Sequence, residues 1–128
     1  MPNVNWQFQG AIPGGPSALL NQPGIPIAAY DVAAVDIAAG ASADVSIQPS
    51  STANDVVFLV VSSDMYNPAI KYTVDALAVK YMLDGPHVLL GSGAVGFLNS
   101  SAPPQKLSFD NGSAKKATVH VMVGRKVP

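Results

Sequence analysis

The two histidines, His87 and His120, are the residues of this chain best suited to acid–base or metal chemistry. A metal site or a Ser-His-Asp arrangement needs partners at defined positions, and the many serines and aspartates here would lie near any histidine by chance. Gly91-Ser92-Gly93 lacks the Gly-x-Ser-x-Gly spacing of a nucleophile elbow. We therefore expect His87, which follows Gly-Pro, to be a turn residue and His120 to be a cross-strand or interface contact. No catalytic residue is predicted.

Two glycine-containing motifs also resemble ligand sites. The segment 91–96 has Gly-x-Gly-x-x-Gly spacing, but a dinucleotide site needs this motif between a strand and a helix. Phe97 and Leu98 continue a β pattern, so a glycine-rich strand or bulge is predicted. Asp110-Asn111-Gly112 lacks the alternating ligands and closing glutamate of a calcium loop, and Asn-Gly favours a hairpin turn. Since spacing selects no acid–base pair among the eight aspartates, we expect neither a metal nor a cofactor.

Four aromatic residues allow two interpretations: Trp6, Tyr66, Tyr72 and Tyr81. They could form a sugar-stacking platform, as in carbohydrate-binding modules. Alternatively, they fill the core or a subunit contact. Their spacing does not place them on one strand face, which favours core or contact.

The composition limits the fold and the partners. The 128 residues are enough for one domain, and the net charge of −1 gives no general electrostatic case for nucleic acid or an anionic membrane. Only 12% of the residues are charged, so the surface is expected to be covered by partners. All eight acidic residues are aspartate and the chain has 11 Gly and 11 Pro, which argues against a mostly helical protein. We expect no signal peptide and no membrane span.

The element around which the fold is expected to form is the run Val56–Val61. It has six consecutive apolar residues, four of them β-branched, between a polar cluster and a turn-like Ser-Ser-Asp. Such a run predicts a strand that is covered on both faces. Burying all six side chains would contribute about 9–18 kcal/mol before chain entropy is subtracted. This strand is therefore the predicted centre of a β core.

Further short alternating segments lie on both sides of this run. Residues 27–47 are predicted to form a hairpin. Residues 70–74 are predicted to form a strand with one solvent-exposed face, and residues 118–123 a strand with Val119, Val121 and Val123 inward. Residues 76–83 favour a continued strand with a bulge or bend near Asp75, with a short helix as the alternative. The further predicted strands are 88–90, 94–98 and 107–109, the last joined to 118–123 through the Asn-Gly turn. Seven to nine such strands predict a two-layer antiparallel β-sandwich of about eight strands, jelly-roll-like or immunoglobulin-like, with a closed barrel less favoured.

Residues 1–26 differ from the sandwich at 27–128. Five prolines and four glycines interrupt them, so we expect either an edge strand with a surface loop or an extended arm that docks on a neighbouring subunit. A proline-rich arm loses less entropy when it becomes ordered, which suits docking. The expected interface combines this arm with the exposed side of the last strand: Trp6, Phe8, Ile12, Leu19, Leu20, His120 and Met122.

Two segments, 35–47 and 107–125, resemble small β-sandwich virion structural proteins of tailed bacteriophages, of the head-decoration (cement) type. The resemblance lies in the general pattern of residues over about half of the chain and includes no diagnostic motif. It implies a homo-oligomer, such as a trimer, seated on a capsid lattice and clasping its neighbours with the N-terminal arm.

The sequence therefore favours a non-enzymatic structural protein whose partners are itself and a capsid or other virion protein. Its expected location is the virion, or the host cytoplasm before assembly. The alternative is a carbohydrate-binding, lectin-like sandwich with tyrosines and aspartates in its loops.

Overall fold

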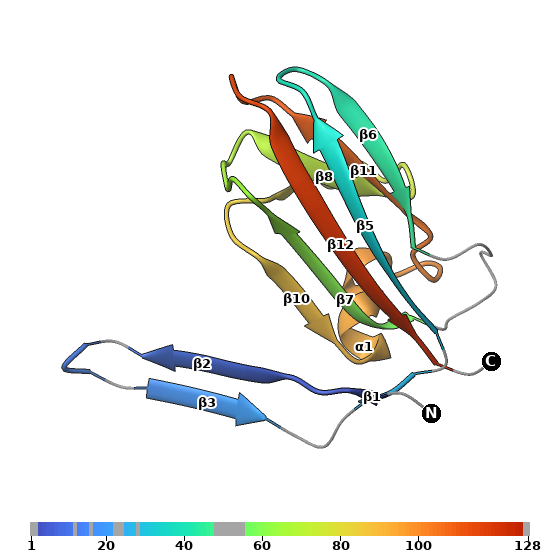
Figure 1. The fold of residues 1–128 in the computed structure, drawn as a ribbon. Helices are drawn as coiled ribbons and strands as arrows, with labels where there is room; N and C mark the ends of the chain where they lie inside the picture. Colours follow the sequence, from blue (N-terminus) through green and yellow to red (C-terminus); the bar gives the residue numbers. More distant parts are fainter. Residues whose placement is uncertain are drawn as a thin grey trace.

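The computed structural model describes residues 3–11, 13–15, 17–21, 25–27, 29–47 and 56–126, with the side chains of 3, 4, 18–21, 25 and 26 left out. Two four-stranded antiparallel sheets pack against each other (Figure 1). The order of the first sheet is β10-β7-β12-β5, and the order of the second is β6-β11-β8-β9. The predicted all-β, two-sheet sandwich of about eight strands is therefore confirmed.

The first sheet contains β5 (Ala29–Ile37), β7 (Val56–Ser63), β10 (His87–Leu90) and β12 (Ala117–Arg125). The second contains β6 (Ser42–Ser46), β8 (Ile70–Val74), β9 (Tyr81–Met82) and β11 (Lys106–Asn111). The predicted central strand is β7, which pairs with both β10 and β12. Its side chains from Val56 to Leu59 are buried, as is Val61, while Val60 is half-buried. The apolar run Val56–Val61 therefore lies in an inner strand of the first sheet, between β10 and β12.

The core lies between the two sheets and is formed by alternate residues of their strands. In β12 the inward residues are Val119, Val121 and Val123, as predicted, and all three are buried. The second sheet contributes its own alternate residues, including Tyr72 and Phe109, whose rings lie 5.2 Å apart between centroids. This alternation with a period of two is what a strand with only one buried face requires.

The predicted hairpins at 27–47 and 107–123 are wrong in their pairing, although their strands are present. β5 and β6 belong to different sheets, and so do β11 and β12. The chain therefore crosses from one sheet to the other at each of these turns. At the second crossing, the buried Asn111 side chain donates hydrogen bonds to the carbonyl oxygens of Ile37 (2.9 Å) and Lys115 (2.7 Å).

The Asn-Gly sequence at this crossing has a packing explanation. A Cβ at Gly112 would lie 3.0 Å from the carbonyl oxygen of Ala69, which accepts a hydrogen bond from the Gly112 N–H. A hydrogen at this position therefore allows the close backbone approach. Asn-Gly is common in tight hairpin turns, which is why a hairpin was predicted. Here the dipeptide lies in a connection between the two sheets.

The continued strand predicted for 76–83 is also wrong. The bend near Asp75 is present, because Asp75 and Ala76 adopt positive φ angles of 52° and 62° and end β8. The chain then reverses, and Tyr81 returns to pair with Tyr72. The Asp75 carboxylate stabilises this strained turn, since it accepts backbone N–H bonds from Gln105 and Lys106 at 2.8–3.2 Å.

The glycine-rich strand or bulge predicted at 91–96 and the strand predicted at 94–98 are replaced by two short helices, α1 (Ser92–Val95) and η1 (Gly96–Leu98). Gly91 leaves β10 with a φ of 91°, which favours glycine, and its N–H donates to the carbonyl oxygen of Val57. Val95 and Leu98 are three residues apart, as on one side of a helix, and both are buried. That spacing explains why the helical conformation is preferred here.

The N-terminal segment forms two-stranded ribbons, where the sequence suggested an edge strand with a surface loop or an extended arm. β2 (Gln7–Ala11) pairs with β3 (Ser17–Asn21), and β1 (Asn3–Val4) pairs with β4 (Ile25–Pro26). The turn between β2 and β3 includes Gly14 with a φ of 73°. Figure 1 shows the β2–β3 hairpin projecting away from the two sheets.

Candidate interaction surface

The outward side of the first sheet carries apolar residues in register across all four strands. One row, in the order β5, β12, β7, β10, is Val32, Met122, Val60 and Val88. A second row, in the same strand order, is Tyr30, Gly124, Phe58 and Leu90. A third row, on the opposite side of the first row, is Ala34, His120 and Ser62 of β5, β12 and β7. We call these three rows the apolar face.

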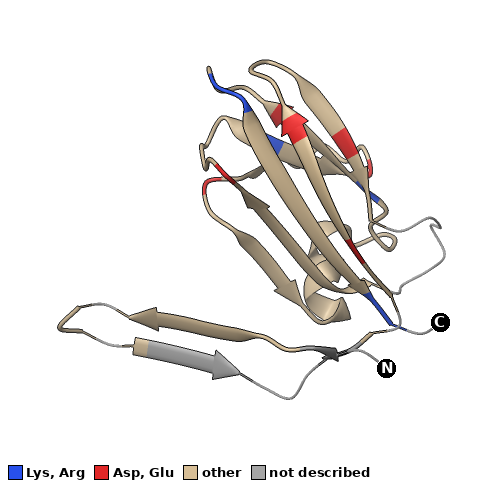
Figure 2. Ribbon diagram, viewed as in Figure 1, with Lys and Arg blue, Asp and Glu red and all other residues tan. Residues whose placement is uncertain are grey.

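Several side chains of the apolar face are open to solvent. Tyr30 is 65% exposed, Val32 61%, Val88 52% and Met122 42%. The three rows contain no Asp, Lys or Arg. Figure 2 shows the charged residues of β5 and β12 toward the ends of these strands, with an uncharged stretch between them. Cross-strand apolar contacts of this kind stabilise a sheet, but exposure on this scale is typical of an interaction surface.

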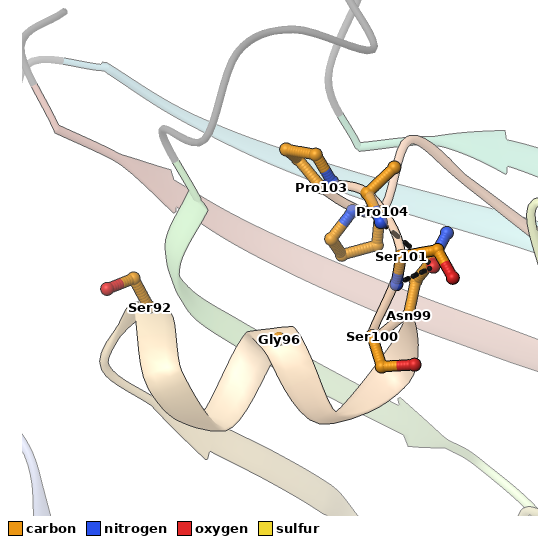
Figure 3. A pocket seen from close by; sticks show the side chains of 8 residues that line it. Ser92, Gly96, Asn99, Ser100, Ser101, Pro103 and Pro104 are labelled. Atoms are coloured by element: carbon orange, nitrogen blue, oxygen red, sulfur yellow. Dashed lines mark hydrogen bonds between the residues drawn. The ribbon is translucent and has the colours of Figure 1, made fainter.

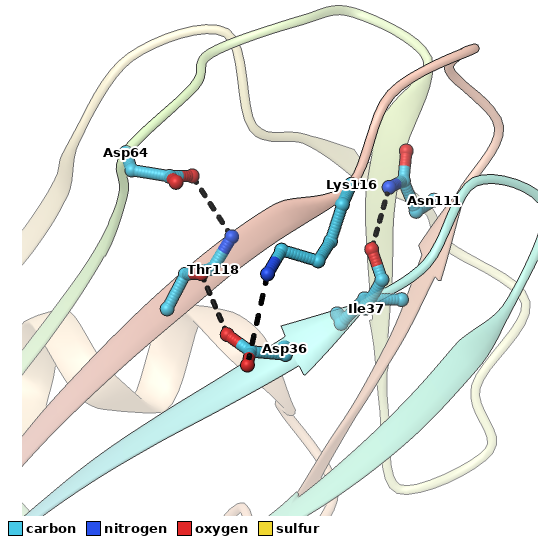
Figure 4. Close-up of polar contacts among 6 residues, drawn as sticks. All are labelled: Asp36, Ile37, Asp64, Asn111, Lys116 and Thr118. Atoms are coloured by element: carbon cyan, nitrogen blue, oxygen red, sulfur yellow. Dashed lines mark hydrogen bonds and ion pairs between the residues drawn. The ribbon is translucent and has the colours of Figure 1, made fainter.

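At one end of the apolar face the polar groups are already used within the chain (Figure 4). The Thr118 hydroxyl donates to Asp36 (2.7 Å), and the Thr118 N–H donates to Asp64 (2.8 Å). Lys116 lies 4.0 Å from the Asp36 carboxylate. These carboxylates therefore join β5, β12 and the end of β7, and we assign them a structural role.

A groove of about 450 Å³ lies where the N-terminal hairpin meets the apolar face. Trp6 and Phe8 line one side of it, and Pro86, Val88 and Leu90 line the other. We call it the hairpin groove. Phe8 is 55% exposed. The Trp6 Nε1–H is buried and has no hydrogen-bond acceptor among the described residues, which is costly unless a partner supplies one.

The structure places the expected interface residues in two neighbouring regions. Trp6 and Phe8 line the hairpin groove, whereas His120 and Met122 lie on the exposed side of β12, as predicted. Leu19 and Leu20 belong to β3, but their side chains are outside the described set, and Ile12 is outside the described residues. The four described residues thus lie on or beside one apolar surface.

His87 is the first residue of β10 and contacts the core, which differs from the turn position predicted for it. Its Nδ1 lies 2.6 Å from the Tyr72 hydroxyl. Burial, together with the neighbouring Tyr81, raises the pKa of Tyr72 above its ordinary value. The phenol therefore keeps its proton and can donate it to Nδ1. We assign this pair a structural role at the edge of the core.

A second hollow, of about 280 Å³, lies between the short helices and the loop before β11 (Figure 3). Of its polar side chains, that of Asn99 is engaged in internal hydrogen bonds. The Asn99 side-chain oxygen accepts from the N–H groups of Ser101 and Ala102, and its amide donates to Asp75 at 3.0 Å. The motif 91–96 lies at the edge of this hollow, but α1 has only four residues and leads into η1 instead of a βαβ unit. We assign no ligand to it.

The aromatic platform considered for sugar binding does not form. Tyr72 is buried in the core, and the Tyr81 ring packs beside it with centroids 5.4 Å apart. Tyr66 is exposed, and Trp6 lies at the hairpin groove. Tyr72 and Tyr81 thus belong to the core or its edge, whereas Tyr66 and Trp6 lie elsewhere, so the four rings do not share one surface.

Sequence reasoning did not select Tyr30, Val32, Val60 or Val88 as surface residues. Alternation marks two sides of a strand, but both sides are apolar in β5 and β7. The available signal was in β5, where three of the four residues between the inward positions are apolar (Tyr30, Val32 and Ala34), whereas a solvated strand carries polar ones.

Among the described residues, no cluster of His, Cys, Asp and Glu could hold a metal ion. In the same part of the chain, no helix has the length and apolar character needed to cross a membrane. The sequence matches no protein-family model in a family scan, and a search of curated proteins finds no match to it.

Proposed function

We propose that the chain is a non-enzymatic structural protein that works by assembly, binding copies of itself and a larger protein shell such as a phage capsid. The N-terminal hairpin and the apolar face are the parts of the molecule that make these contacts. The role is that of a decoration or cement protein, which stabilises a lattice by bridging its subunits.

The observation that carries this proposal is the position of the β2–β3 hairpin. It pairs with no strand of either large sheet. An isolated two-stranded hairpin is only marginally stable in water, so contact with a partner would stabilise it substantially. Phe8, near the start of β2, is more than half exposed and offers a large apolar anchor to such a partner.

The strand order gives further support. Of the connections between β5 and β12, only that from β8 to β9 stays within one sheet. The orders β10-β7-β12-β5 and β6-β11-β8-β9 agree with an eight-stranded jelly roll of two Greek keys, to which we assign the fold. Jelly rolls are common in viral capsid and lectin domains, but fold alone does not determine function.

The assembly role is tested by measuring the mass of the full chain in solution by light scattering after size-exclusion chromatography. We expect an oligomer, and we expect Phe8→Asp to weaken it because a carboxylate replaces the apolar anchor. Tyr66→Asp is the matched control, since Tyr66 is also an exposed aromatic residue (40%) but lies in a loop of the sandwich. A monomer at all concentrations, or equal effects of the two substitutions, would contradict the assembly role of the hairpin.

The virion assignment needs a separate observation. We expect the neighbouring genes to encode capsid, portal or tail proteins, and we expect peptides of this chain in purified phage particles. A calcium-dependent signal on a glycan array from a monomeric chain would instead support a lectin.

A further inference from the structure

We infer that the apolar face is the contact surface between two copies of this chain, packed face to face about a two-fold axis parallel to the strands. This inference rests on the proposed assembly role and specifies which surface forms the first contact. The partner is a second copy of the same face, and the hairpin of each copy lies at the rim.

The exposed apolar area is sufficient for a pair. Tyr30, Val32, Val88, Met122 and Phe8 together expose roughly 500 Å² of apolar surface, given that a whole aromatic side chain presents about 150–250 Å². Two such faces in contact would bury about 1,000 Å² from these side chains alone, which reaches the lower bound for a specific interface. No Asp, Lys or Arg belongs to the three rows, so pairing would desolvate no carboxylate, ammonium or guanidinium group of these rows.

The register of the sheet determines the orientation. A two-fold axis parallel to the strands keeps each row opposite itself but exchanges its ends. The β5 strand of one copy then lies over β10 of the other, which brings Val32 opposite Val88 and Tyr30 opposite Leu90. The most exposed side chains of β5 therefore meet the hairpin groove, which borders Val88 and Leu90.

This orientation also addresses the unpaired donor in the groove. The Trp6 Nε1–H has no acceptor among the described residues, and Tyr30 carries an exposed phenolic oxygen. In the proposed pair the Tyr30 side chain of one copy approaches the groove of the other, and its oxygen can accept that hydrogen bond. A groove filled in this way would lose both its empty volume and its unsatisfied polar group.

The first test uses two methionines with similar exposure on opposite sides of the sandwich. Met122 (42% exposed) lies on the apolar face, and Met82 (49% exposed) lies on β9 in the second sheet. We expect Met122→Asp to raise the dimer dissociation constant about 100-fold or more, because two carboxylates would be buried in each pair. Met82→Asp should leave it unchanged, and circular dichroism should show both variants folded.

The outcomes separate this inference from the proposed function. A wild-type chain that is monomeric at all concentrations overturns both. An oligomer that persists in Met122→Asp, or that is lost equally in Met82→Asp, overturns the pairing of the apolar faces but leaves assembly through the hairpin intact.

The second test locates the contact and needs no background substitutions, because the chain has no cysteine. Val32→Cys and Val88→Cys proteins are mixed and treated with a short bis-maleimide whose reach matches the ~10 Å between packed sheets. We expect cross-linked dimers in the mixture and few in either protein alone, and Met82→Cys replaces Val88→Cys as the control. If Val32→Cys couples to Phe8→Cys instead of Val88→Cys, the second copy's hairpin occupies the face and the proposed pairing is wrong.

Discussion

The two outward faces of the sandwich differ in chemistry although they cover the same core. The apolar face presents Val32, Met122, Val60 and Val88 in one row. On the other sheet, the outward residues of β6, β11 and β8 are Ser, Asp, Lys and Thr, and one row there consists of Asp44, Ser108 and Thr73. We call this second surface the polar face. The central strands of both sheets bury their inward residues, so the fold does not require the difference.

The polar face shows how a solvated sheet of this protein is composed. The Lys106 amine lies 3.8 Å from the Asp44 carboxylate across two strands, and the Ser42 hydroxyl donates to Asp110. Such residues retain contact with water and form cross-strand pairs. Valine and methionine side chains, which occupy the middle of the first sheet, form no hydrogen bonds with water. The comparison therefore supports the proposal that the first sheet, and not the second, is covered by another protein surface.

The largest expected effect concerns what the two faces share, their common core. Phe109 is fully buried and stacks near Tyr72, whereas Ser108 beside it points outward on the polar face. We expect Phe109→Ala to lower the free energy of unfolding by about 3–5 kcal/mol because of lost burial and a residual cavity. Ser108→Ala should change it by less than about 0.5 kcal/mol. Urea unfolding monitored by circular dichroism measures both, and similar losses would show that the alternation assigned to β11 is incorrect.

The next effect concerns the connection between the sheets. Asn111 is 1% exposed, and its side chain bonds to the carbonyl oxygens of Ile37 and Lys115 and to the Ser113 N–H. We expect Asn111→Ala to cost about 2–4 kcal/mol, because it removes these bonds and leaves a buried carbonyl unpaired. Asn99→Ala is the control, since that side chain also makes several hydrogen bonds, to its own loop and to Asp75, but is only half-buried. Equal losses in urea unfolding would argue against a special role for the crossing.

The third prediction exchanges the chemistry of the two faces. Val32→Thr with Val88→Thr should reduce self-association about tenfold while changing the stability of the monomer by less than about 1 kcal/mol, because threonine retains the β-branched shape that strands favour. Conversely, Lys71→Val with Thr73→Val places apolar residues on the polar face beside Met82 and should create new association. Sedimentation velocity over a concentration series measures both changes. If the valine pair on the polar face leaves the chain as soluble and as weakly associated as before, exposed apolar area is not what drives assembly.

Local patterns were sufficient to predict most strands but not their partners. The run Val56–Val61 and the alternation from Thr118 to Val123 depend on adjacent residues, so both were predicted correctly. Sheet membership depends on which distant segments lie side by side. A turn such as Asp110-Asn111-Gly112 can connect two strands of one sheet or cross between sheets, and the choice here involves the buried Asn111 amide and the close approach of Ala69. No neighbouring residue carries that information.

The candidate site was predicted in part for the same reason. Met122 and His120 could be placed outward because the inward valines of β12 define its other side. Their combination with Val32, Val60 and Val88 follows only from the register of four strands that are distant in sequence. The short helices at 92–98 were missed because so short an apolar segment has too few residues for periodicity to separate a strand from a helix.

The smallest expected effect tests whether the polar face is stabilised by its charges or merely solvated. Lys106 and Asp44 are both about half exposed or more, with side-chain exposures of 49% and 61%, and are 3.8 Å apart. An exposed pair of this kind contributes about 0–1 kcal/mol, because water screens it and two flexible side chains must be held in place. We therefore expect Lys106→Ala to change the free energy of unfolding by less than about 0.5 kcal/mol and to leave self-association unaltered. Lys115→Ala, which removes an exposed lysine outside the strands, is the control. If Lys106→Ala lowers the free energy of unfolding by more than about 1 kcal/mol, and this loss disappears in high salt, electrostatic pairing stabilises the polar face. The polar residues of that face would then contribute to folding stability as well as to contact with water.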